Sequence, residues 1–272
     1  MPERKSKMDV VRRMSARQLV LAVAAVLVVV SWASCMLRSP AAEASDGYGG
    51  VVDFFEAGAL RAAGDARPDS GTGVPSGLHK ASQWVYMNDS EWAAFVDLQV
   101  AGLRPPLDGS RPVRVLEVGS GVGAFALRLL QLHPGKLTYY GVDPSITAVR
   151  VSRRALRSFP NVVLGMGDVR LVPFADEFFD HALAPGCLCY LPTLGDVEAA
   201  VVELVRVLRR GGSGMFSVMA RSKAGKGSCK TIVPSDTWAK WGAAHGFTAN
   251  VMASDFIVGQ RERDIVFVTK LE

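Results

Sequence analysis

The chain has 272 residues, of which 49% are hydrophobic and 8% aromatic, which is enough apolar material for a packed domain and excludes a largely disordered protein. Its formal net charge of +5 is concentrated near the amino terminus, because beyond residue 37 the basic and acidic residues number 25 and 24. A nearly neutral domain has no electrostatic footprint for a polyanion, so we expect no nucleic-acid partner.

An uncharged, apolar segment covers residues 18–37. Its last 19 residues, as a helix rising about 1.5 Å per residue, would span roughly 28 Å, close to the thickness of a hydrocarbon core. The tail of residues 1–17 carries six basic residues, so the positive-inside rule keeps it in the cytosol. We predict a single-pass type II signal anchor in a membrane, with the domain lumenal or extracytoplasmic. A cleaved signal peptide or a transit peptide is the alternative.

The remaining chain divides into a linker and a domain. Residues 38–76 are rich in Ala, Gly, Ser, Asp and Pro, a composition typical of a flexible stalk. The domain is expected over residues 77–272. Its first helix is predicted over residues 90–101, after an N-cap signal at Asn88.

A glycine-rich turn lies at the centre of this domain. Residues 113–118 are typical of a buried parallel strand, and a helix is predicted over residues 125–132. Glycines suit the turn between them because a Cβ would block a ligand lying there, and because some positions need φ > 0. The start of the helix offers unpaired N–H groups to that ligand. The turn alone does not name the ligand, since it also fits the looser dinucleotide pattern.

Strands and helices alternate after the turn. Strands are predicted over 137–142, 162–164, 179–183 and 214–219, and helices over 145–159, 193–208 and 236–245. This alternation predicts an α/β fold: a Rossmann-like, doubly wound, mostly parallel seven-stranded sheet. The last two strands, over 248–254 and 265–269, resemble a hairpin and predict an antiparallel strand at the carboxyl terminus.

Acidic residues stand at the ends of three successive predicted strands: Glu117, Asp143 and Asp168. Ligands of such sheets bind at the carboxyl ends of the strands. An acid after the second strand can accept two hydrogen bonds from a ribose diol. Asp143 is also a candidate N-cap for the helix that begins near Ser145, and the two roles are compatible.

Four sequence blocks, in this order, resemble the class I S-adenosylmethionine-dependent methyltransferases, in particular the small-molecule type 11 group. They are Leu116-Glu-Val-Gly-Ser-Gly-Val-Gly123, Tyr140-Gly-Val-Asp143-Pro-Ser, the segment from Gly167-Asp168 to Phe179-Asp180, and the segment from Glu203 to Gly212. The resemblance extends over residues 77–270 and is most specific over 113–212. It implies S-adenosylmethionine as cofactor and a small-molecule or lipid-like methyl acceptor.

The same resemblance implies a set of cofactor-binding residues. The turn and the acid before it would hold the methionine part, Asp143 the ribose, Asp168 and the Val169 amide the adenine, and Pro185 would lie beside the sulfonium. The full set is Glu117, Gly119, Ser120, Gly121, Gly123, Asp143, Pro144, Asp168, Val169 and Pro185.

Other features of the sequence limit what the resemblance implies. The run Ala184-Pro-Gly-Cys187 is not the Asn/Asp-Pro-Pro-aromatic motif of enzymes that methylate nucleobase amines. A general base is needed only if the acceptor loses a proton, and no residue is assigned that role. Tyr86, His181, Cys187 and Tyr190 are pocket candidates that are more often packing residues. Two alternatives stay open: a non-catalytic cofactor-binding or scaffold protein of the same fold, and an NAD(P)-dependent reductase.

The four cysteines are too few for a disulfide scaffold in a chain of this length. Cys187 and Cys189 have the wrong spacing for a zinc site, and no histidine cluster accompanies them, so no metal is expected. We interpret both as ordinary small residues near the end of a strand.

Overall fold

The computed structural model of the chain describes residues 88–272 with the exception of 105, 108–111, 220–229 and 259–260. The predicted basic tail, transmembrane segment, stalk and domain start at residue 77 therefore lie outside the described residues. Within the part that is described, no helix has the length and apolar composition that crossing a membrane requires.

Seven strands form one mixed sheet in the order β3-β2-β1-β4-β5-β7-β6. The first five strands pair in parallel, whereas β7 is antiparallel to both β5 and β6. This arrangement confirms the predicted Rossmann-like sheet with an antiparallel carboxyl-terminal strand. The strands are β1 (Val113–Val118), β2 (Leu137–Asp143), β3 (Val162–Met166), β4 (Phe179–Ala184), β5 (Leu208–Met219), β6 (Phe247–Val258) and β7 (Arg261–Lys270).

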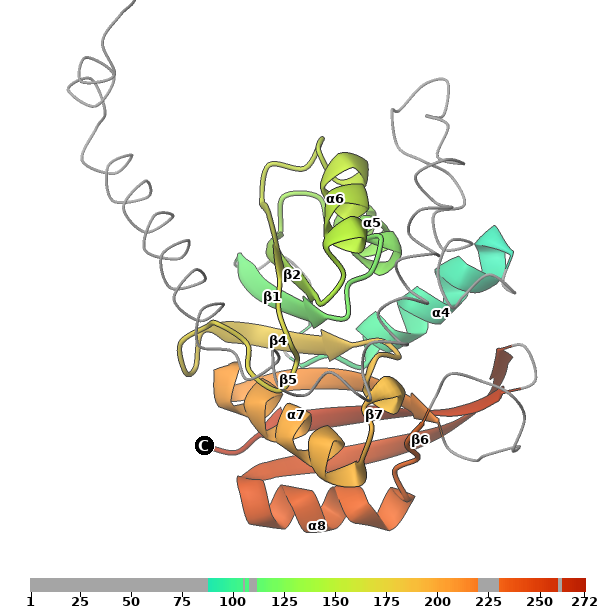
Figure 1. Cartoon of the computed structure of the whole chain (residues 1–272), viewed down its shortest axis with the longest axis vertical. Helices are drawn as coiled ribbons and strands as arrows, with labels where there is room; N and C mark the ends of the chain where they lie inside the picture. The colour runs from blue at the N-terminus through green and yellow to red at the C-terminus, as the bar shows by residue number, and fades with distance from the viewer. Residues whose placement is uncertain (1–87, 105, 108–111, 220–229, 259–260) are drawn as a thin grey trace, which may run out of the picture. The chain divides into compact units, whose positions relative to one another are not determined.

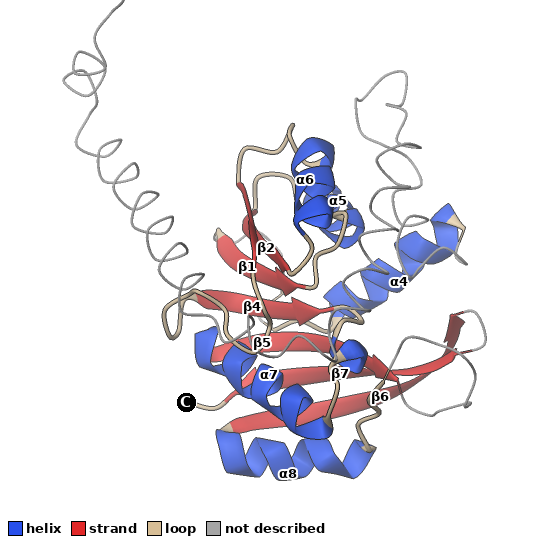
Figure 2. Cartoon of the chain, viewed as in Figure 1, coloured by secondary structure: helices blue, strands red, loops and turns tan. Residues whose placement is uncertain are grey.

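Helices cover both faces of this sheet, as Figure 1 and Figure 2 show. Helices α4, α5 and α6 share one hydrophobic core with the sheet, and α7 and α8 pack near β4, β5 and β6. The helices are α4 (Asp89–Ala101), α5 (Ala124–Leu132), α6 (Ile146–Ala155), α7 (Leu194–Val207) and α8 (Ser235–His245), with a 3-10 helix, η3 (Leu188–Tyr190).

Several element boundaries differ from the sequence prediction, and two of them, in α6 and β5, have a local cause. Helix α6 ends at Ala155 rather than at 159, and a proline at position 160 disfavours helical backbone just before it. Strand β5 begins at Leu208 rather than at 214, because the backbone becomes extended directly after α7. Gly211 then adopts φ of +66° within the strand, a conformation that glycine adopts without steric cost.

The aromatic residues of the third sequence block have a packing role. Phe174, Phe178 and Phe179 surround Tyr140 of β2, with ring centroids 5.2 to 5.7 Å from the tyrosine ring. The Arg114 guanidinium lies 4.4 Å from the centroid of Phe178. This part of the block therefore covers one face of the sheet.

Candidate functional site

The glycine turn joins β1 to α5 and is held against β2. The Ser120 amide donates to the carbonyl of Val142 at 3.2 Å, and the Gly121 amide donates to the Asp143 carboxylate at 2.7 Å. Gly119, Gly121 and Gly123 adopt φ of +66°, +52° and +84°. All three conformations are strained for other L-residues, so the expectation of positive φ is confirmed at each position.

The three glycines differ in what a side chain would meet. A Cβ on Gly119 would lie 2.4 Å from the Cβ of Cys187, and one on Gly123 would lie 3.0 Å from the Cβ of Ser152 in α6. A Cβ on Gly121 would meet no described atom within 4 Å. Close packing thus requires two of the glycines, and the third faces open space where a ligand can approach the backbone.

Glu117, the last acid of β1, is buried beside this turn. Its carboxyl oxygen accepts a hydrogen bond of 2.6 Å from the hydroxyl of Tyr139 in β2. Burial raises the pKa of Glu117 to about 8, against the lowering effect of the tyrosine hydrogen bond. The side chain is therefore mostly protonated at neutral pH in the structure as it stands.

Asp143 connects the end of β2 to the glycine turn. One carboxylate oxygen accepts from the Gly121 amide, and the other accepts from the Ser145 amide at 2.9 Å. The N-cap of α6 is Ser145, whose hydroxyl accepts from the Ala148 amide, so the candidate role of Asp143 as the N-cap is wrong. A carboxylate offers about four lone-pair positions, which leaves capacity for a ligand hydroxyl.

Asp168 follows β3 close to Asp143, since the Gly167 amide donates to the Asp143 carbonyl at 3.2 Å. Its carboxylate is held by the guanidinium of Arg170, with Nη2 at 2.6 Å and Nε at 3.1 Å. The same guanidinium donates through Nη1 to Asp196 of α7 at 2.9 Å. Arg170 thus joins the turn after β3 to the start of α7.

The segment after β4 approaches the glycine turn from a third side. The buried Pro185 precedes Gly186, and the Cys187 thiol donates to the Val118 carbonyl at 3.3 Å. Cys189 is disulfide-bonded, which corrects its interpretation as an ordinary small residue. Cys187 keeps its thiol and is not in a disulfide. Nothing among the described residues groups three or more metal-ligating side chains.

Two of the four pocket candidates have a clear environment in the structure. His181 is buried in the middle of β4, with Nδ1 3.1 Å from the Ser213 hydroxyl oxygen, a position that suits sheet packing. Cys187 is half-buried against Gly119, next to the turn. Tyr190 is buried in η3, and Tyr86 lies outside the described residues.

The predicted cofactor residues therefore gather at the carboxyl ends of β1 to β4. Their individual roles as cofactor contacts stay predictions. Tyr139 and Arg170, which hold two of the three acids, were missed in the sequence. Tyr139 had one signal: it lies two residues before Gly141, on the strand next to Glu117, and alternate residues of a strand share a face.

Comparison with known proteins identifies the same part of the chain. Residues 116–216 match the family model of the methyltransferase domain. The demethylmenaquinone methyltransferase of Chlorobaculum parvum is 28% identical over 109 residues, which cover 40% of this chain and 42% of that protein. The malonyl-[acyl-carrier protein] O-methyltransferase of Geobacter sulfurreducens is 31% identical over 111 residues, which cover 41% of this chain and 40% of that protein. The chain thus spans less than half the length of these relatives.

A solved structure shares the fold over a longer stretch. The [4+2]-cyclase SpnF superposes with a TM-score of 0.58 at 18% identity, covering 81% of this chain and 95% of that one. At this level of identity the likeness describes the fold.

Proposed function

We propose, from the chain's membership of the class I S-adenosylmethionine-dependent methyltransferases, that it transfers the methyl group of S-adenosylmethionine to a small-molecule or lipid-like acceptor. The observation that carries the proposal is the meeting of the glycine turn, Asp143 and Asp168 at one end of the parallel strands. The two relatives named above act, by their names, on demethylmenaquinone and on a malonyl group carried by a protein. They support a small or carrier-bound acceptor rather than a nucleic acid.

The residues present fit this cofactor. Gly121 leaves the approach to the turn open, and α5 begins there with amide groups directed towards a ligand. In the proposed complex Asp143 accepts from the ribose hydroxyls, while Asp168 and the Val169 amide contact the adenine. Glu117 and the turn hold the methionine part, with Pro144 and Pro185 alongside.

Bound S-adenosylmethionine supplies a methyl group on a positively charged sulfur. The chain contributes alignment of the acceptor and exclusion of water, which account for much of the rate of such a displacement. Cys187 contacts the turn on the segment after β4, where an acceptor would approach, and Tyr190 follows in η3. We assign no general base, because an acceptor that needs no deprotonation needs none.

A membrane-anchored location is part of the proposal. The uncharged segment 18–37 supports a type II anchor with the domain on the far side of the membrane. The disulfide of Cys189 supports a lumenal or extracytoplasmic domain, because disulfides persist mainly in oxidising compartments.

The function is tested by incubating purified full-length protein with methyl-labelled S-adenosylmethionine in two parallel reactions. One reaction also contains a lipid extract, and the other a water-soluble extract. Label that enters a product with the wild type, and fails to enter with Asp143→Ala, supports methyl transfer and identifies the acceptor fraction. If the protein binds S-adenosylmethionine but labels nothing, the non-catalytic alternative is favoured. Binding of NADPH in place of S-adenosylmethionine would favour a reductase.

A further inference from the structure

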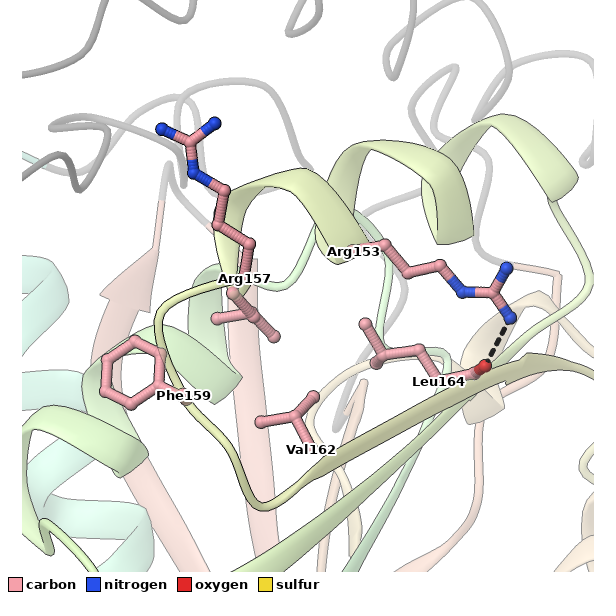
Figure 3. Close-up of a pocket in the computed structure, with 6 residues that line it drawn as sticks. Arg153, Arg157, Phe159, Val162 and Leu164 are labelled. Atoms are coloured by element: carbon pink, nitrogen blue, oxygen red, sulfur yellow. Dashed lines mark hydrogen bonds between the residues drawn. The ribbon is translucent and has the colours of Figure 1, made fainter. Parts of the chain in front are cut away.

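A cavity of about 240 Å³ lies between the end of α6 and β3, away from the candidate site. Figure 3 shows Arg153 and Arg157 on the helix side, with Val162 and Leu164 of β3 opposite them. Two arginines and four apolar residues line the cavity. The lining residues are Arg153, Leu156, Arg157, Phe159, Val162 and Leu164.

The cavity is separate from the cofactor site. It is lined by Val162, the first residue of β3, whereas Asp168 follows the other end of the same strand. Residues of a strand advance about 3.3 Å each, so the two ends of β3 lie roughly 13 Å apart. None of the residues proposed for the cofactor lines the cavity.

The cavity lies in an unbalanced positive region. Arg150, Arg153, Arg154 and Arg157 are all exposed, and residues 144–167 contain no Asp or Glu. In the described part of the chain none of these four arginines forms an ion pair, whereas Arg170 and Arg206 do. The helix dipole favours basic residues in the last turn of α6, but Arg157 lies beyond the helix.

The two cavity arginines have donors to offer. Arg153 Nη2 donates to the carbonyl of Leu164 at 2.7 Å, which holds the guanidinium over the edge strand β3. A guanidinium has five N–H donors, so most of those on Arg153 stay available. In Figure 3 the Arg157 side chain extends away from Arg153 and from β3, so its guanidinium has to turn back over the cavity to reach a bound anion.

We propose that this cavity binds a phosphate monoester that carries a short apolar group. Guanidinium forks match phosphate oxygens in geometry and charge, and the half-buried side chains of Phe159 and Val162 leave a small apolar floor for a short hydrocarbon part. The volume lies below the roughly 300 to 1,000 Å³ typical of sites for drug-sized ligands. The site therefore takes the phosphate end of a larger molecule or a small ester, which could come from a lipid headgroup or from a soluble metabolite.

The test is calorimetric titration of the full-length protein with butyl phosphate, compared with inorganic phosphate and with butanol. Three variants are titrated beside the wild type. Arg157→Gln removes a cavity cation, and Val162→Phe fills the cavity without changing charge. Arg154→Gln is the matched control, because Arg154 lies in the last turn of α6, close to Arg157 in the chain, but does not line the cavity. Binding of S-adenosylmethionine, retained in all variants, reports that each is folded.

Butyl phosphate should bind at least about tenfold more tightly than inorganic phosphate, since the apolar floor adds to the charge contacts. Arg157→Gln and Val162→Phe should each weaken the binding of butyl phosphate by about tenfold or more, and Arg154→Gln should weaken it by less than about twofold. Equal loss in Arg154→Gln and Arg157→Gln, or no preference over inorganic phosphate, or no binding of butyl phosphate, would overturn the proposal. Tighter binding of dihexanoyl phosphatidic acid than of butyl phosphate identifies the lipid source, and the reverse order the soluble one.

Discussion

The hydroxyl of Tyr139 donates a 2.6 Å hydrogen bond to the carboxyl group of Glu117, and both side chains are buried next to the glycine turn. The bond depends on Gly141, because a Cβ there would lie 2.9 Å from Cε1 of the tyrosine ring. Burial also raises the pKa of the Tyr139 hydroxyl well above its usual range, so this group acts as a donor throughout the physiological range. The pair ties β1 to β2 directly below the proposed cofactor site.

Protonation of Glu117 should make the stability of the protein depend on pH. The pKa of Glu117 in the folded state, about 8, exceeds its ordinary value of 4.5, so between these values the folded state binds more protons than the unfolded state. Its contribution to stability is therefore complete below about pH 4.5 and is lost as the pH rises towards 8. Urea unfolding across this range should show a decline in the free energy of unfolding that Glu117→Gln removes. An unchanged decline in the variant would assign the pH dependence to other groups.

Space at Gly141 is a second testable requirement. Gly141→Ala would place a Cβ 2.6 Å from Leu164 Cδ2 and 2.9 Å from Tyr139 Cε1. We expect overpacking to cost about 1 to 3 kcal/mol of unfolding free energy, measured by urea denaturation. The control is Gly195→Ala in α7, where the nearest atom is 3.8 Å away and alanine favours the helix by roughly 0.5 to 1 kcal/mol. Equal effects of the two substitutions would contradict the packing explanation.

Arg170 should determine how strictly the site selects adenine. Its guanidinium fixes the Asp168 carboxylate and anchors it to Asp196. Arg170→Gln should weaken the binding of S-adenosylhomocysteine by about tenfold. It should also reduce the preference of the site for this ligand over the analogue that carries hypoxanthine in place of adenine, since a misplaced Asp168 carboxylate no longer selects the 6-amino group.

Calorimetry with both ligands measures this preference. Arg210→Gln serves as the control, because Arg210 pairs with the half-exposed Glu177. An unchanged preference in Arg170→Gln, even with weaker binding of both ligands, would mean that Arg170 supports the fold without setting the base preference.

The local patterns of the sequence predicted the strand, turn and helix around Gly119 and the positions of Asp143 and Asp168 at strand ends. These features depend on neighbours in the chain, where residue type alone restricts the backbone. The contacts of Arg170 could not be predicted, because Asp196 lies 26 residues further on and the side chain bridges two elements. The disulfide of Cys189 was missed for the same reason, since pairing depends on distance in space rather than on spacing.

The predicted anchor gives a result that needs no structure. The uncharged segment 18–37 is long enough to span a hydrocarbon core of about 30 Å, so alkaline carbonate should leave the full-length protein in the membrane pellet. A chain that lacks residues 1–37 should move to the supernatant. Release of the full-length chain would instead support a cleaved signal or transit peptide.

The central claim is that the strand ends bind S-adenosylmethionine, and calorimetric titration of the purified protein tests it most directly. Asp143→Ala removes the proposed ribose acceptor and one partner of the Gly121 amide, so affinity should fall by about a hundredfold while the thermal midpoint reports a folded chain. Asp97→Ala breaks an ion pair with Arg128 between α4 and α5, and should bind like the wild type. No measurable binding by the wild type, or equal affinity in Asp143→Ala, would contradict the account.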